Sequence, residues 1–159
     1  MTTAPDIEII AQTSADAMWA EDHASRGLGM TLVRVAPGLA VLSMPVTQAM
    51  VNGHGLAHGG FIFTLADSAF AFACNSHGQR CVAQNCQITF VAPGRLGMTL
   101  TADARERQRA GRSGIYDVTV RDETSAVIAE FRGHSRAIAG SLVAGSLVAG
   151  SLVAGSLVE

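Results

Sequence analysis

The stretch 58–74 has apolar residues on nearly every side of a helical projection, which is typical of a buried helix rather than a surface one. The polar side chains that interrupt it, Thr64, Asp67 and Ser68, are spaced i, i+3 and i+4 and therefore share one face. An unpaired buried carboxylate is energetically costly, so Asp67 must have a partner or a function. The pattern predicts one long central helix with an acid inside it.

Two glycines, Gly59 and Gly60, stand where this helix begins, so we expect backbone N–H groups there that no side chain covers. Such a helix N-terminus favours a substrate oxygen. Asp67 lies eight positions further on, about 12 Å along a helix axis. One carbonyl group therefore cannot contact both groups in the same chain. If both act on it, they come from two chains, with the helices antiparallel in a symmetric dimer.

Alternating apolar positions predict strands, and turn residues separate them. The expected strands are 29–36, 39–46, 81–92, 98–108, 113–121 and 125–135. From Ser14 a second pattern predicts a short amphipathic helix that ends at Arg26-Gly27 and covers one edge of the sheet. The short connections favour a largely antiparallel sheet that wraps the apolar helix, in an α+β architecture.

The two ends of the chain differ from this central domain, which we expect to span residues 14–138. Residues 1–13 are expected to form a loose N-terminal arm. Residues 139–159 repeat Ala-Gly-Ser-Leu-Val four times before Glu159, and a period of five matches neither a helix nor a strand. Although about 20 uncharged residues are long enough to cross a bilayer, we favour duplicated coding sequence over a membrane anchor or a solenoid coil.

Composition narrows the function classes. A chain of 159 residues suits one domain, and a net charge of −2 without a basic run argues against nucleic-acid binding. Cys74, Cys81 and Cys86 have no CxxC spacing, and the N-terminus lacks the features of a signal peptide, which together favour the cytoplasm. No HxxxH, HExxH or paired CxxC organises the histidines and cysteines, so no metal site is predicted.

Several motifs resemble one enzyme family. The run Asn52-Gly53-His54, His58-Gly59-Gly60 and Leu65-Ala66-Asp67, followed by 71–75, is similar to the hotdog-fold acyl-CoA thioesterases of the phenylacetic acid degradation type. The stretches 90–94, 114–117 and 131–135 resemble the same family in the same order, and the resemblance covers about 18–138. It implies a hotdog fold, with a long central helix wrapped by a curved antiparallel sheet of five to six strands. It also implies protomers paired edge to edge, and a dimer of dimers.

The resemblance also implies roles for individual residues. Asp67 would be the general base or nucleophile, the Gly59 N–H would polarise the thioester carbonyl across the dimer interface, and Asn52 would position the carbonyl or water. No cofactor is implied, because coenzyme A is part of the substrate. His58 is expected to orient the site, and arginines are expected to bind the phosphates of coenzyme A. The candidate substrate-binding residues are His58, Gly60, Thr64, Ser68, Arg95 and either Arg109 or Arg112.

Other interpretations stay open at this point. Asp67 has a structural interpretation, in which its carboxylate bonds Ser68, Thr64 or nearby backbone. Thr64 and Ser68 have one too, because such hydroxyls often bond the preceding helical turn. A hotdog dehydratase or hydratase acting on hydroxyacyl thioesters would combine a histidine such as His58 with a carboxylate. A module that binds acyl-CoA without turnover is the remaining class.

Overall fold

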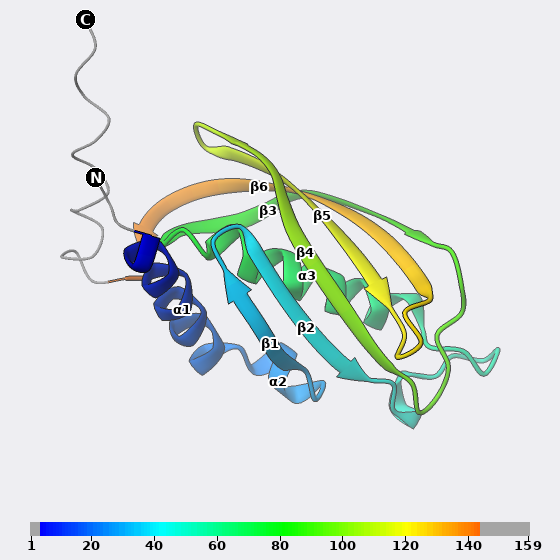
Figure 1. Ribbon diagram of the computed structural model, residues 1–159. Helices are drawn as coiled ribbons and strands as arrows, with labels where there is room; N and C mark the ends of the chain where they lie inside the picture. Colours follow the sequence, from blue (N-terminus) through cyan, green and yellow to red (C-terminus); the bar gives the residue numbers. More distant parts are fainter. Residues whose placement is uncertain (1–3, 144–159) are drawn as a thin grey trace, which may run out of the picture.

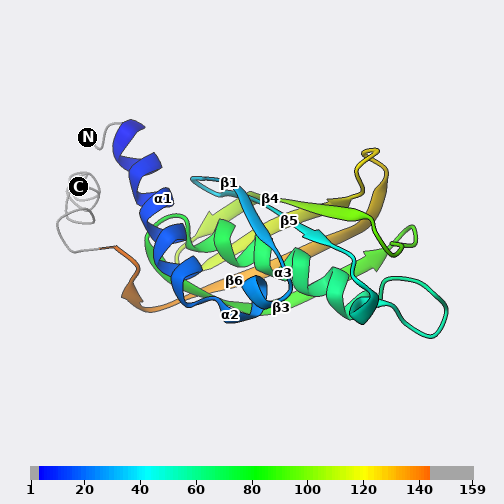
Figure 2. The same cartoon turned by 90° about the horizontal axis from the view of Figure 1, so that it is seen from below.

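Helix α3 (Gly59–Asn75) lies across the inner face of a curved six-stranded sheet, as Figures 1 and 2 show. The computed structural model describes residues 4–143. Every neighbouring strand pair is antiparallel, in the order β1-β2-β4-β5-β6-β3. The strands are β1 (Thr31–Ala36), β2 (Leu39–Pro45), β3 (Gln79–Phe90), β4 (Thr99–Ala110), β5 (Ser113–Arg121) and β6 (Val127–Ser141). The predicted α+β fold and the predicted central helix are confirmed.

The core lies between α3 and the inner face of the sheet. Residues of β5 alternate as predicted, so that Tyr116, Val118 and Val120 are fully buried while their neighbours face outward. Phe70 of α3 packs against Tyr116 with ring centroids 5.5 Å apart. A Cβ at Gly133 of β6 would lie 2.8 Å from the Phe70 ring. A glycine at this position therefore allows the helix to approach the sheet closely.

The N-terminal region is helical earlier than the sequence indicated. Helix α1 (Ala4–Glu21) packs against the edge strand β1 and against α3, so the prediction of a loose arm over residues 1–13 is wrong from Ala4 onward. A second helix, α2 (His23–Gly27), follows, and its Asp22 cap accepts a hydrogen bond from the Ser25 N–H at 2.9 Å. Within the described residues, no helix has both the length and the apolar character needed to span a membrane.

The last strand is longer than predicted. β6 runs to Ser141 and pairs with the start of β3, so the first repeat unit, 139–143, belongs partly to the sheet. The carbonyl of Gly78 accepts hydrogen bonds from the Leu142 N–H at 2.8 Å and from Ser141 Oγ at 3.1 Å, and Val143 is buried. The predicted domain boundary at residue 138 is therefore wrong. The rest of the repeat lies outside the described residues.

A polar cluster fixes the C-terminal end of α3. The Glu106 carboxylate of β4 accepts a hydrogen bond from the Tyr116 hydroxyl at 2.7 Å and lies 2.7 Å from His77 Nε2. Burial lowers the pKa of His77, although the adjacent Glu106 opposes that shift. Burial also raises the pKa of Tyr116, and the bond to Glu106 raises it further. The cluster ties the helix end to two strands.

Candidate active site

The loop before α3 places Asn52 beside the start of the helix. A short 3-10 helix, η1 (Gln48–Met50), leads into this loop. The Asn52 Oδ1 atom accepts hydrogen bonds from the backbone N–H groups of His54 at 2.9 Å and Leu56 at 3.2 Å. Two N–H donors to one atom identify it as the amide oxygen. The Nδ2 group is left as a donor with no acceptor among residues 4–143.

His58 caps α3 and changes the predicted donor set. The Nδ1 atom of its ring accepts a hydrogen bond from the Gly60 N–H at 2.9 Å. The backbone N–H of His58 donates to the Met50 carbonyl at 2.8 Å. The expectation that both glycine N–H groups are uncovered is therefore wrong for Gly60. The Gly59 N–H has no acceptor in the described part of the chain. One helix-end donor remains for a substrate.

A cavity of about 530 Å³ lies beside Gly59. Gly59 and Asn52 both line it, and most of its other walls are apolar. Phe90 covers the glycine, because a Cβ at Gly59 would lie 2.9 Å from Phe90 Cζ. The full lining is Asn52, Leu56, Ala57, Gly59, Ile62, Phe90, Val91, Ala92, Pro93 and Gly94. A carbonyl group in this cavity would lie between two donor residues and an apolar wall, an arrangement that suits acyl transfer.

Asp67 lies on the same helix but does not line this cavity. Burial raises the pKa of the Asp67 carboxyl, and a hydrogen bond from Cys86 partly offsets that shift. The Cys86 Sγ atom lies 3.6 Å from Asp67 Oδ1. Eight helical residues correspond to about 12 Å. The structure thus brings Asn52 and Gly59 together and leaves Asp67 apart from them in the same chain.

The two hydroxyl residues on this face of α3 already have partners. Thr64 Oγ1 donates to the Gly60 carbonyl at 2.8 Å, which is the bond to the preceding turn that such residues often make. Ser68 Oγ lies 2.9 Å from Ser25 Oγ of α2. Neither residue lines the cavity at Gly59. Their contacts fit the structural interpretation better than the predicted role in substrate binding.

The candidate arginines lie at opposite ends of β4. Arg95 is in the loop before this strand and forms an isolated bridge with Leu56, a residue that lines the cavity. Arg112 follows the strand, and its Nε and Nη2 atoms donate to the Ala137 carbonyl at 3.2 and 3.0 Å. A twelve-residue strand spans about 40 Å. Only Arg95 is therefore near the cavity of the same chain, and Arg109, which ends β4 with Ala110, is at the far end.

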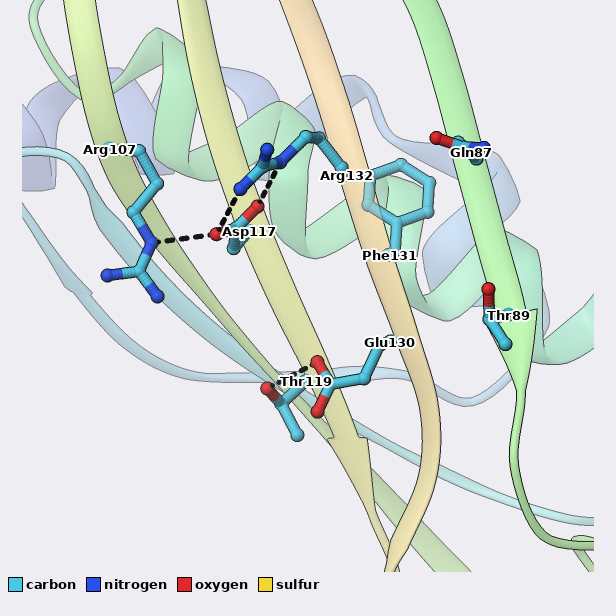
Figure 3. Close-up of a pocket in the computed structure, with 8 residues that line it drawn as sticks. All are labelled: Gln87, Thr89, Arg107, Asp117, Thr119, Glu130, Phe131 and Arg132. Atoms are coloured by element: carbon cyan, nitrogen blue, oxygen red, sulfur yellow. Dashed lines mark hydrogen bonds and ion pairs between the residues drawn. The ribbon is translucent and has the colours of Figure 1, made fainter.

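A second depression, of about 510 Å³, lies on the sheet face opposite α3 (Figure 3). Its centre is Asp117, which accepts from Arg107 Nε at 2.8 Å and from Arg132 Nε at 2.6 Å. The bond to Arg132 is the main cause that lowers the pKa of Asp117. The residues that line it include none of the predicted site residues. Its charges are largely paired at the surface, so the cavity at Gly59 is the stronger candidate for the active site.

Comparison with known proteins identifies the family. The Thioesterase superfamily profile matches residues 54–129, which include Gly59 and Asp67. Acyl-coenzyme A thioesterase PaaI of Escherichia coli is 42% identical over 132 residues, covering 83% of this chain and 94% of that protein. The chain belongs to the thioesterase superfamily. The predicted family and the predicted enzyme class, a hydrolase of thioesters, are confirmed.

Solved structures confirm the hotdog fold of this thioesterase. The Escherichia coli PaaI protein from the phenylacetic acid degradation operon matches with a TM-score of 0.83 at 41% identity, over 85% of this chain and 98% of that one. A Thermus thermophilus protein matches with a TM-score of 0.72 at 36% identity, over 74% and 99%. A Streptococcus mutans protein bound to acetyl-CoA matches with a TM-score of 0.68 at 27% identity, over 70% and 90%.

The sequence did not reveal two side chains that shape the site of this thioesterase. Phe90 was noted only within a family motif, and Cys86 only as a possible metal or redox residue. Within residues 4–143, no three metal-binding side chains lie together. The inward position of Cys86 depends on the register between β3 and β6, where it pairs with Gly133. The alternation within β3 was the available signal, but it does not say which helix residue lies opposite.

Proposed function

We propose that this thioesterase hydrolyses small or aromatic acyl-CoA substrates, of the phenylacetyl-CoA or hydroxylated phenylacetyl-CoA type, to the free acid and coenzyme A. The observation that carries the proposal is the Gly59 N–H, which has no acceptor among residues 4–143 and lies beside Asn52 in a largely apolar cavity. The Escherichia coli relative is an acyl-coenzyme A thioesterase from the phenylacetic acid degradation operon. The Streptococcus mutans relative holds acetyl-CoA, which supports coenzyme A as the carrier.

In the proposed reaction, the Gly59 N–H and Asn52 Nδ2 hold the thioester oxygen as it becomes negative. Asp67 of the other protomer attacks the carbonyl carbon or takes a proton from the attacking water. The C–S bond then breaks and coenzyme A leaves as a thiolate, which takes up a proton. On the nucleophilic route, water then hydrolyses the acyl–Asp67 anhydride, which releases the acid and restores the carboxylate. Thiolate is a good leaving group, so a carboxylate and two donors suffice. The raised pKa of Asp67 makes it a stronger base than an exposed aspartate.

The proposed site requires a dimer, and β3 is the edge that suits it. β3 is the last strand of the sheet, and most of its residues are exposed, including Val82 and Phe90. A long edge strand with exposed apolar residues readily pairs with another strand. Antiparallel pairing of two β3 edges would set the α3 helices of two protomers side by side. The proposal includes a further pairing of dimers into tetramers.

Binding of coenzyme A is assigned to the mouth of the cavity, with no separate cofactor. Arg95 lies in the loop that borders the cavity and is exposed, so it is the candidate for a phosphate contact from the same chain. Arg112 can take part only from another protomer. The three cysteines are free, which suits the proposed cytoplasmic location.

A panel of acyl-CoA substrates tests this function. We expect phenylacetyl-CoA and hydroxylated phenylacetyl-CoA to release free thiol faster than palmitoyl-CoA, because a cavity of about 530 Å³ suits a short or aromatic acyl group. The assay follows thiol with a disulfide reagent and, with a 3-hydroxyacyl-CoA, follows double-bond absorbance. A new double bond without thiol would indicate a dehydratase. Ligand-dependent thermal stabilisation without either signal would indicate a binding module.

Asn52→Asp separates the catalytic role of Asn52 from its structural one. Aspartate keeps the oxygen that accepts from the His54 and Leu56 N–H groups, but it has no Nδ2 donor. We expect kcat/KM for phenylacetyl-CoA to fall by roughly 10²–10³ with little change in melting temperature. Asn52→Ala removes both functions and should also lower the melting temperature. Wild-type turnover in Asn52→Asp would show that Nδ2 does not contact the substrate.

A further inference from the structure

The strand β3 places a thiol against the carboxylate assigned to catalysis. Cys86 Sγ lies 3.6 Å from Asp67 Oδ1, within the range for a sulfur donor. Among residues 4–143 this is the only side-chain hydrogen bond that Asp67 makes, and Oδ2 has no partner there. The candidate structural partners Ser68 and Thr64 are instead bonded to Ser25 and to the Gly60 carbonyl. The orientation of the Asp67 carboxylate thus depends on Cys86.

The proton of this pair stays on sulfur. Burial is the main cause that raises the pKa of Cys86 to about 11, and the Asp67 carboxylate adds to the shift. Asp67 has a raised pKa, yet as a carboxylic acid it remains a far weaker base than a thiolate of that kind. Cys86 is therefore a hydrogen-bond donor at neutral pH. It is a poor candidate for the nucleophile, because a nucleophilic cysteine needs a thiolate.

In the described part of the chain, no charged group competes with the neutral Cys86 thiol for Asp67. Burial and Cys86 are the two causes that shift its pKa, and no arginine or histidine from the strands or from α2 contributes. The charge of Asp67 contributes to the raised pKa of Cys74, on α3, but the Cys74 thiol donates to the Ala71 carbonyl at 3.4 Å. The charge of Arg109 lowers the pKa values of Cys81 and His77, which lie near the C-terminal end of α3. Among residues 4–143, Cys86 is the one titratable side chain from another element that bonds the Asp67 carboxylate.

We propose that Cys86 is a positioning residue for thioester hydrolysis, which holds Asp67 Oδ1 so that Oδ2 is directed at the thioester. This inference rests on the proposed function. A thiol is a weak donor, so it orients the carboxylate while withdrawing little of its basicity. A hydroxyl, amide or guanidinium at the same place would hold the carboxylate more strongly and would lower its pKa further. The thiol thus combines a fixed orientation with a basic carboxylate.

The test compares Cys86→Ala with Cys81→Ala, a matched control on the same strand that does not bond Asp67. Loss of the S–H bond is expected to lower kcat for phenylacetyl-CoA by about two- to fivefold, with KM unchanged. The acidic limb of kcat/KM should move to higher pH in Cys86→Ala, because the charged carboxylate has lost a donor. Cys81→Ala should keep the wild-type limb. Cys86→Ser restores a donor and should return the limb to the wild-type position or below it.

A reciprocal measurement does not depend on turnover. Removing the charge in Asp67→Asn should lower the pKa of Cys86, so iodoacetamide should alkylate this thiol faster than in the wild type, as followed by mass spectrometry. Equal or slower alkylation would show that the two groups do not interact. If the wild type releases no thiol from any acyl-CoA, the proposed function is wrong. If the wild type is active but Cys86→Ala and Cys81→Ala share one pH profile, the positioning role is wrong.

Discussion

Asp67→Asn is expected to lower kcat/KM for phenylacetyl-CoA by roughly 10²–10⁴, the range that a general base contributes. The amide keeps the size of the side chain but can neither attack the carbonyl nor accept a proton from water. The same substitution should raise the melting temperature at neutral pH. Substitution of an aspartate that stabilises the fold would instead lower the melting temperature. Turnover and melting temperature together therefore separate a catalytic aspartate from a structural one.

The expected stabilisation follows from the direction of the pKa shift. Burial raises the pKa of Asp67 in the folded protein, so the native state binds this proton more tightly than the unfolded chain does. The contribution of this proton to the free energy of unfolding is fully present below the pKa that Asp67 has in the unfolded chain. It is lost as pH rises through the pKa that Asp67 has in the folded protein. At neutral pH the buried charge therefore destabilises the fold, and the neutral amide removes that cost. Below both pKa values the two proteins should have similar melting temperatures.

The pH dependence of turnover provides a second check on Asp67. A base must be deprotonated, so wild-type kcat/KM should fall as pH drops through the raised pKa of Asp67. Activity should thus be lost at a higher pH than an exposed aspartate would allow. Full activity in Asp67→Asn, or an acidic limb at the ordinary aspartate pKa, would contradict the assignment.

Periodicity was sufficient to predict the centre of this fold. The stretch now seen as α3 is apolar on nearly every side, and such a helix must be enclosed. The alternation of β5 predicted its bounds, Ser113–Arg121, because one face of this strand is buried and the other is exposed. In β3 the alternation is weak, since most of this edge strand is exposed. Its predicted bounds are accordingly shifted by two residues.

The sequence predicts an N-terminal helix but places its start at Ser14 instead of Ala4, because a serine resembles a helix start. Ser14 fits the pattern of a helix N-cap, but its Oγ donates to the Ile10 carbonyl one turn earlier at 2.8 Å. The buried side of α1 begins before it, with Ile10 and Ala11, and continues at Ala15. A bond to the preceding turn and a helix cap use the same residue type. Only the fold against β1 distinguishes them.

The residues of the candidate site were predictable from the sequence, but the hydrogen bonds that they make were not. Gly59, Asn52 and Asp67 were identified from a motif, but the capping of Gly60 by His58 depends on the side-chain rotamer. The bond from Cys86 depends on strand register, which no local pattern encodes. The extension of β6 into the repeat also follows from its partner, because β3 has backbone groups that Ser141 can pair with. Such long-range contacts decide what the local pattern leaves open.

Gly59→Pro is expected to remove the helix-end donor with little effect on the helix. Gly59 is the first residue of α3, where proline is tolerated, and its N–H makes no bond within the described residues. His58 has φ −64 and ψ 131, an extended conformation that a following proline requires. Both Gly59→Pro and Gly59→Ala introduce a Cβ near Phe90. The alanine variant therefore controls for the steric change, and proline should cost a further factor of roughly 10²–10³ in kcat.

Mixed dimers of Gly59→Pro and Asp67→Asn test whether the two groups act from different chains. Each parent protein is expected to be nearly inactive. In a mixed dimer with shared sites, one site receives both defects and the other receives none, so the purified heterodimer should show about half of the wild-type activity. If both groups of a site came from one chain, every site would carry one defect and the heterodimer would stay inactive. Differently tagged protomers allow its isolation, and Gly59→Ala with Asp67→Asn provides the matched control. Gly59 and Asp67 of one chain are separated by about 12 Å along α3, which makes the shared site the expected result.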